Sequence, residues 1–117
     1  MQLRDENYKP FPNHWTFPGG TKEAHESPRE TSLRELQEEY GYKPSLMEEV
    51  ITIYHHSHQI AEHHYYVPLD NGVADLQFNE GKKSELFTLD EIEKLKLGWW
   101  SKEVIPVLRK HISELGF

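Results

Sequence analysis

Hydrophobic and polar residues alternate in short blocks along the chain, and some of these blocks begin with the start signals of helices. Ser27-Pro28-Arg29-Glu30 offers a capping hydroxyl, a proline at the first helical position and a glutamate three residues after the cap. Thr88-Leu89-Asp90-Glu91 repeats the capping pattern. The predicted helices extend from Ser27 to near Gly41, from Thr88 to about Leu95, and from Ser101 or Pro106 to Leu115, where Gly116 ends the last one.

Runs rich in β-branched and aromatic residues predict strands between and around these helices. The two clearest runs, residues 50–54 and 63–69, are expected to lie in one sheet, with a turn at residues 70–72 after the second. Strands mixed with helices in this way predict an α+β, or mixed α/β, sandwich. Shorter strands are expected at residues 15–17, 74–78 and 84–87, and at Leu3.

Composition narrows the classes of function. The 117 residues are enough for one modest core and no linker divides them, so residues 1–117 are expected to form a single domain. A net charge of −7 disfavours broad binding to nucleic acid or to an anionic membrane, because both need an excess of lysine and arginine. The chain contains no cysteine, no long apolar run and no secretory signal, so the cytoplasm is the expected location.

Three glutamates crowd the helix that begins after Ser27. Glu35, Glu38 and Glu39 are related by i, i+3 and i+4, so they project within roughly one 100° arc. An ordinary solvated acidic face is one interpretation, but like charges at this spacing destabilise a helix, and Arg34 neutralises only part of the cluster. The other interpretation is a site for a hard divalent cation such as Mg²⁺, which binds carboxylate oxygens, water and substrate phosphates.

The spacing of residues before and within this helix follows a known pattern. Gly20, five residues, Glu26, seven residues and then residues 34–41, RELQEEYG, match G-x5-E-x7-R-E-U-x-E-E-x-G-U at every fixed letter, where U is aliphatic. Only the last U differs, since Tyr42 stands there. The chain therefore resembles a Nudix hydrolase of the MutT type. Residues 15–20 are similar to the strand that leads into this Nudix box, and residues 80–89 to a segment downstream of it.

The resemblance implies a Nudix-type α/β/α sandwich with a mixed sheet. Members usually have about one more strand before the segment that begins here at Met1, so we expect a sheet that lacks this strand, or one completed by a second copy in a homodimer. The implied reaction is Mg²⁺-dependent hydrolysis of the diphosphate linkage in a nucleoside diphosphate derivative, with Mn²⁺ as an alternative ion. A small nucleotide such as a dNTP or an oxidised nucleotide is the expected substrate, and a nucleotide-binding sensor without turnover is the alternative.

Two substrate subgroups of the family are slightly disfavoured. Proteins of the ADP-ribose type tend to carry a proline about sixteen residues past the box, where this chain has His58. Dinucleoside-polyphosphate types tend to carry a tyrosine near the same place, where this chain has His58-Gln59-Ile60.

The resemblance also assigns roles to individual residues of the box. Glu38 and Glu39 are the expected principal metal ligands, and Glu35 is a ligand or the base that takes a proton from the attacking water. The carbonyl of Gly20 is expected to complete the coordination. Arg34 is expected to hold the glutamates in orientation. The remaining box residue, Glu26, is expected to support the site without binding the metal itself.

The candidate site residues outside the box each have a second interpretation, which the sequence leaves open. Glu80, before Gly81, matches a segment that supplies a ligand or base in MutT-type proteins, but it also reads as an exposed turn residue; Glu62 and Glu85 are reserves. The candidate substrate-binding residues are Gly19, Gly20 and Trp99, although Trp99 and Trp100 more often pack in a core or lid than stack on a base.

Five histidines lie in or near the two clearest strands. Imidazole is a frequent ligand of transition metals, but this set lacks a carboxylate pair at helical spacing and has no cysteine to complete a tight site. We therefore interpret these residues as incidental to metal binding, with contact of one of them to a base or phosphate as the alternative. They are His55, His56, His58, His63 and His64.

Overall fold

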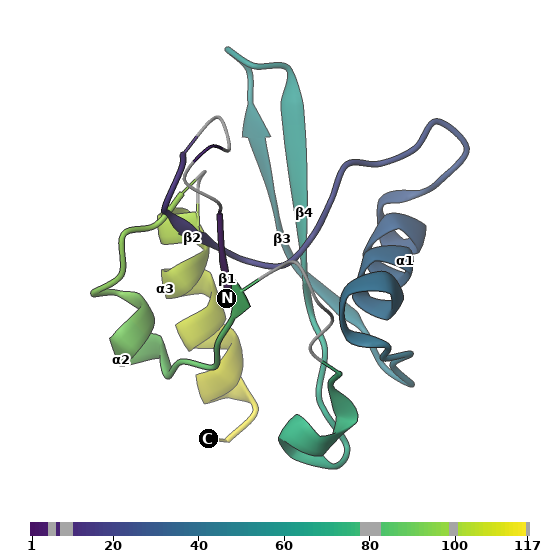
Figure 1. Cartoon of the computed structure of the whole chain (residues 1–117), viewed down its shortest axis with the longest axis vertical. Coiled ribbons are helices and arrows are strands. Elements are labelled where there is room, and N and C mark those ends of the chain that lie inside the picture. The colour runs from purple at the N-terminus through teal and green to yellow at the C-terminus, as the bar shows by residue number, and fades with distance from the viewer. Residues whose placement is uncertain (5–6, 8–10, 78–82, 99–100, 117) are drawn as a thin grey trace. The chain divides into compact units, whose positions relative to one another are not determined.

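Helices and short strands alternate along the chain in the computed structural model, which describes residues 1–4, 7, 11–77, 83–98 and 101–116 (Figure 1). The chain divides into two units, Met1–Pro18 with Phe78–Phe117, and Gly19–Gln77. The mixed α/β class predicted from the sequence is confirmed. No described helix combines the length and the apolar composition that spanning a membrane requires.

Helix α1, Pro28–Tyr40, is capped at both ends by residues next to it in the sequence. At its start, the Glu30 backbone N–H donates to Ser27 Oγ over 3.2 Å, and the Glu30 carboxylate accepts from the Ser27 backbone N–H over 3.0 Å. At its end, Gly41 adopts a left-handed φ of 62° and donates its N–H to the carbonyl of Gln37 over 2.8 Å. The helix predicted between Ser27 and Gly41 is confirmed.

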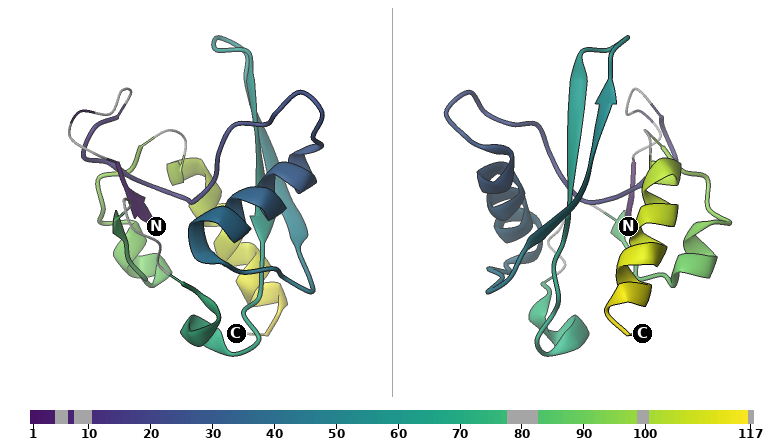
Figure 2. Two further views of the ribbon diagram at one scale, coloured as in Figure 1. Left: turned by 45° about the vertical axis from the view of Figure 1, so that its right-hand side comes forward. Right: turned by 180° about the vertical axis from the view of Figure 1, so that it is seen from behind.

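Two antiparallel strands after α1 form a long hairpin, which Figure 2 shows from two sides. β3, Glu48–His55, pairs along its length with β4, Ile60–Tyr66. The strands predicted over residues 50–54 and 63–69 are therefore present in one sheet. The second ends before Pro68, because proline has no N–H to donate to a strand ladder.

The strand predicted over residues 74–78 is wrong in its described part. Gly72–Asp75 form a short 3₁₀ helix, η1, instead. The Asp75 carboxylate accepts hydrogen bonds from the backbone and the side-chain amide of Asn71, over 2.9 and 3.1 Å, and so closes the chain into a turn. Phe78, the last residue of the predicted strand, lies outside the described residues.

A second, smaller sheet lies in the other unit. β1, Gln2–Leu3, pairs antiparallel with β2, Trp15–Thr16, on one side and with β5, Lys83–Ser84, on the other. The strands expected at Leu3 and at residues 15–17 are present. The strand expected over residues 84–87 is wrong beyond Ser84, where the chain leaves the sheet on its way to the cap of the next helix.

Two helices belong to the same unit as this smaller sheet (Figure 1). α2, Leu89–Ile92, begins at the predicted capping box of Thr88 and Glu91. α3, Ser101–Glu114, contains Pro106 in its interior. The sequence left its start open between Ser101 and Pro106, and the structure places it at Ser101, so the helix continues through Pro106 although proline has no backbone N–H to donate.

Replacing Gly41 with alanine is expected to destabilise the protein by about 1–2 kcal/mol, because a side chain strains a left-handed φ. The new Cβ would also lie 2.9 Å from Gln77 Oε1. Gly72→Ala is the matched control, since Gly72 has the same φ of +62° and no described atom within 4 Å of a Cβ. Urea unfolding should rank Gly41→Ala below Gly72→Ala in stability; equal stability of Gly41→Ala and the wild type would contradict this account of the helix end.

Candidate active site

Two of the three glutamates predicted to bind metal, Glu35 and Glu38, share one arginine on α1. Arg34 donates from Nη1 to Glu35 Oε1 over 3.0 Å and to Glu38 Oε2 over 3.4 Å. Glu39 follows Glu35 by four residues and therefore lies one turn further along the same face. The Glu35 side chain is 16% exposed and that of Glu38 is 59% exposed, so Glu35 is the more buried of the two carboxylates and Glu38 is open to solvent.

The carboxylate of Glu26 holds Arg34 from the other side. Its Oε2 accepts from Arg34 Nε over 2.7 Å and its Oε1 from Arg34 Nη2 over 3.0 Å, so the two groups meet as a two-pronged pair. Oε1 also accepts from the Glu23 backbone N–H over 3.0 Å and from the Thr31 hydroxyl over 3.1 Å. Hydrogen bonds from Arg34, and next from Glu23, hold the pKa of Glu26 down to about 2, so this buried side chain is ionised at neutral pH.

The two glycines before α1 differ in the space around them. A methyl group added to Gly20 would overlap the carboxylate of Glu35, whereas no described atom lies within 4 Å of a methyl group added to Gly19. Glycine at position 20 therefore lets the backbone of the loop approach Glu35 closely.

Glu35 lies where a negative charge is disfavoured. Burial is the largest cause that raises its pKa, followed by the charge of Glu39, while Arg34 acts in the opposite direction. A nearby cation would relieve both causes. The residues fit a hard divalent ion such as Mg²⁺ or Mn²⁺, because the side-chain donors are all carboxylate oxygens and the cradle at Gly20 has no room for a Cβ.

Another cluster in the described residues has its possible ligand atoms within 4.8 Å of one another: Glu23, His25 and Glu26. The Glu26 carboxylate is occupied by Arg34, and His25 Nε2 lies 3.6 Å from Glu23 Oε2 at an exposed position. This cluster is therefore explained without an ion. The α1 carboxylates are not drawn together to the same extent, in keeping with the repulsion between like charges.

Comparison with known protein families identifies the family of this chain. The model of the NUDIX domain matches residues 2–108. The chain belongs to the Nudix family. The fold class predicted from the sequence, a mixed α/β fold of the Nudix type, agrees with this membership.

One curated relative covers part of the chain. It is a protein of Bacillus subtilis (strain 168) named "Putative ADP-ribose pyrophosphatase YjhB", and it is 41% identical over 54 residues. These residues make up 44% of this chain and 26% of the relative, so the match spans about a quarter of the relative's length.

Four of the predicted residues outside the Nudix box are either not described or belong to the other unit. Glu80, Trp99 and Trp100 lie outside the described residues. Glu85 belongs to the other unit, where its backbone N–H donates to the carbonyl of Met1 over 3.0 Å. Glu62 lies on β4, where its Oε1 accepts a hydrogen bond from His64 Nε2 over 2.8 Å.

Carboxylates accompany the histidines of the hairpin, a feature that the sequence interpretation missed. On one face, the Glu62 carboxylate lies between His64 and His55, whose Nε2 is 3.7 Å from Glu62 Oε2. On the other face, His63 Nδ1 lies 3.1 Å from Glu49 Oε1, and Thr52 donates its hydroxyl proton to the same oxygen. The alternation of Glu62 and His64 along β4 was the available signal, because residues two apart on a strand share a face.

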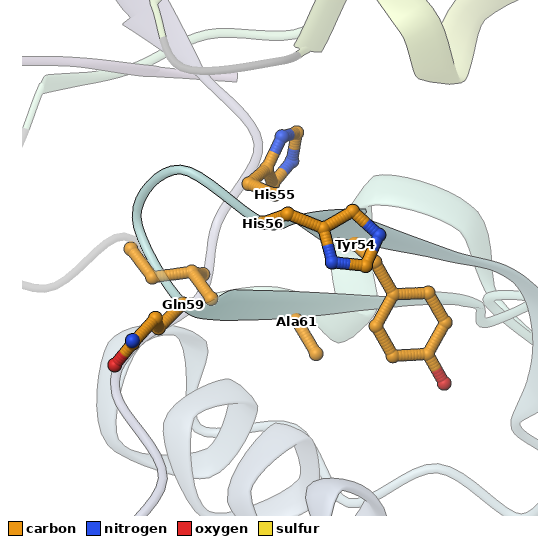
Figure 3. A pocket seen from close by; sticks show the side chains of 6 residues that line it. Tyr54, His55, His56, Gln59 and Ala61 are labelled. Carbon is orange, nitrogen blue, oxygen red and sulfur yellow. The ribbon is translucent and has the colours of Figure 1, made fainter.

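A shallow, open pocket of about 200 Å³ lies at the turn of the hairpin (Figure 3). In that view, His55 projects to the opposite side of the strand from Tyr54. The lining is mainly exposed, and its buried member, His55, lies beside Glu62. The lining residues are Tyr54, His55, His56, Gln59, Ile60 and Ala61.

The pair between Glu26 and Arg34 predicts a specific dependence of stability on pH. The unfolded Glu26 carboxyl has the ordinary pKa of 4.5 and the folded one about 2, so its ionised form stabilises the fold above pH 4.5, and this contribution is lost as pH falls toward 2. Urea unfolding without metal should show the largest difference between wild type and Glu26→Gln above pH 4.5, and a shrinking one below it. Glu103→Gln, at an exposed position of α3, is the control; a difference for Glu26→Gln that does not change with pH would refute the assignment.

Proposed function

We propose that the chain hydrolyses a phosphoanhydride bond in a nucleoside diphosphate derivative and that Mg²⁺, or in its place Mn²⁺, is required. The observation that carries the proposal is the contact between the loop at Gly20 and Glu35, on a helix face that also presents Glu38 and Glu39. Membership in the Nudix family supports it, since hydrolysis of small nucleotide derivatives is the activity of that family.

Each residue of the box has a part in this proposal. Glu38 and Glu39 bind the ion as principal ligands, and Glu35 binds it or takes the proton of the attacking water. Arg34 orients these carboxylates, and Glu26 holds Arg34 in place. Bound there, the ion supplies positive charge against the substrate phosphates and lowers the pKa of water. The backbone at Gly19 and Gly20 is free of side chains and lets the phosphates approach; Trp99 and Glu80 stay candidates for substrate binding and catalysis.

Two classes of substrate are in competition. The sequence favours a nucleoside triphosphate, a dNTP or an oxidised nucleotide, and the name of the Bacillus subtilis relative points to ADP-ribose. The sequence argument against ADP-ribose rests on His58, which lies in the exposed turn of the hairpin. A panel of dNTPs, oxidised nucleotides, ADP-ribose and dinucleoside polyphosphates, scored for phosphate released after coupling to a phosphatase, distinguishes these classes.

Organisation and partners follow from the same proposal. Residues 1–117 act as a single Nudix domain on a small nucleotide in the cytoplasm, without nucleic acid or membrane as partner. A homodimer stays a prediction, which light scattering at several protein concentrations checks.

The metal proposal predicts that millimolar Mg²⁺ or Mn²⁺ raises the melting temperature, because an ion that binds only the folded state stabilises it by mass action. The rise should be smaller in Glu38→Gln, which lacks one charged ligand oxygen. Calorimetry that detects no binding of either ion, with and without nucleotide, would contradict the assignment of α1 as a metal site.

Turnover separates an enzyme from a nucleotide sensor. Glu38→Gln or Glu39→Gln removes a charged ligand oxygen while nearly preserving shape, so kcat/KM should fall by roughly 100-fold or more, about 3 kcal/mol of transition-state stabilisation. Glu48→Gln, at an exposed position of β3 outside the box, is the control and should keep full activity. Clear nucleotide binding by the wild type without hydrolysis of any panel member would instead favour the sensor.

A further inference from the structure

Thr31 lies in the part of the Nudix box that the pattern leaves unspecified, yet its side chain reaches a charged group of the site. It is 5% exposed on α1. Its Oγ1 lies 3.1 Å from Glu26 Oε1 and 3.2 Å from the carbonyl oxygen of Ser27. A hydroxyl has a single proton, and a carboxylate is the stronger acceptor, so we assign the donated hydrogen bond to Glu26.

This hydrogen bond acts on the oxygen that determines how the Glu26 carboxylate is turned. Oε1 takes three donors, from Thr31, from the Glu23 backbone and from Arg34 Nη2, whereas Oε2 takes the Nε of Arg34. Two of these donors do not belong to Arg34: the Glu23 backbone N–H, which precedes Glu26 in the chain, and the Thr31 hydroxyl, which follows it. They hold Oε1 of the carboxylate in addition to its pair with Arg34.

The plane of Glu26 in turn fixes the plane of Arg34, because a guanidinium that makes two parallel hydrogen bonds to a carboxylate lies nearly coplanar with it. The remaining nitrogen, Nη1, then points at Glu35 Oε1 over 3.0 Å and at Glu38 Oε2 over 3.4 Å. A tilt of the guanidinium would change both distances together.

We propose that Thr31 is a positioning residue of the active site: its hydroxyl sets the orientation of Glu26 and, through Arg34, that of the metal-binding glutamates Glu35 and Glu38. This inference rests on the proposed function for its effect on turnover. Its effect on Arg34 and on metal binding can be measured without turnover.

Thr31→Val tests the proposal, since valine keeps the β-branched shape and removes the hydroxyl. Isothermal titration of Mn²⁺ into the substrate-free protein should show binding weakened about tenfold, the order expected when a charged group loses a hydrogen-bond donor. The NMR signal of the Arg34 Nε–Hε group should shift and exchange faster with water. In turnover assays kcat should fall about tenfold with little change in KM, because the substrate itself is not contacted.

Two further variants make the result specific. Thr31→Ser restores the hydroxyl and should recover Mn²⁺ binding and the Arg34 signal even if it lowers the melting temperature. Ser32→Ala removes the next hydroxyl along α1 and should leave both readouts unchanged. If Thr31→Val does not fold, Thr31→Ala removes the same hydroxyl without placing a methyl group against the carboxylate and takes its place.

The possible outcomes separate this inference from the proposed function. A folded Thr31→Val with a lower melting temperature but wild-type Mn²⁺ binding and an unchanged Arg34 signal overturns the inference and leaves a purely structural threonine. The predicted changes in Mn²⁺ binding and in the Arg34 signal, in a protein that hydrolyses no panel member, support the inference and reject the enzymatic function.

Discussion

The ion pair between Glu26 and Arg34 is the interaction on which the rest of the site depends. Glu26 ends the loop that begins at Gly19, and Arg34 lies in the second turn of α1, so their two hydrogen bonds join loop and helix. A buried carboxylate without such a partner would cost several kcal/mol of desolvation. The pair therefore holds the loop against the helix, together with the hydrogen bond from Thr31 to Glu26.

The same pair determines the electrostatics of the helix face. Arg34 donates hydrogen bonds to the carboxylates of Glu26, Glu35 and Glu38, and the shortest of them is to Glu26. The remaining contacts of Arg34, to Glu35 and Glu38, are longer, and burial and the charge of Glu39 disfavour the ionised form of Glu35. A face built in this way is short of positive charge, and a divalent cation supplies that charge better than a second arginine would, because it leaves positions open for phosphate oxygens.

The parts of the fold that could be predicted from the sequence are those fixed by local contacts. The ends of α1 depend on Ser27, Glu30 and Gly41, which lie within a few residues of the helix termini they cap, and their identities alone predict the geometry. The segment after β4 could not be predicted in the same way. Its apolar residues favour a strand, but hydrogen bonds between Asn71 and Asp75 close it into η1.

The residues of the site divide in the same way, into those that the sequence predicts and those that only the structure reveals. Spacing alone placed Gly20, Glu26, Arg34 and the three glutamates in one motif, and the structure brings the loop and helix residues together. Thr31 was missed, because a threonine inside a helix usually hydrogen bonds to the carbonyl four residues before it and gives no sign of a second partner. The carboxylate partners of the hairpin histidines were missed for a related reason: which residues face each other across two strands depends on a register that neither strand reveals alone.

This division also explains why substrate identity is the least specified property of the chain. ADP-ribose and a nucleoside triphosphate both offer a pair of linked phosphates, so the α1 carboxylates and the ion proposed for them cannot distinguish between these substrates. Discrimination of the base and of the leaving group requires contacts that one substrate makes and the other does not, and these lie outside the Nudix box. A chain can therefore keep every residue that handles phosphate and still change its substrate through substitutions that leave α1 and its loop untouched.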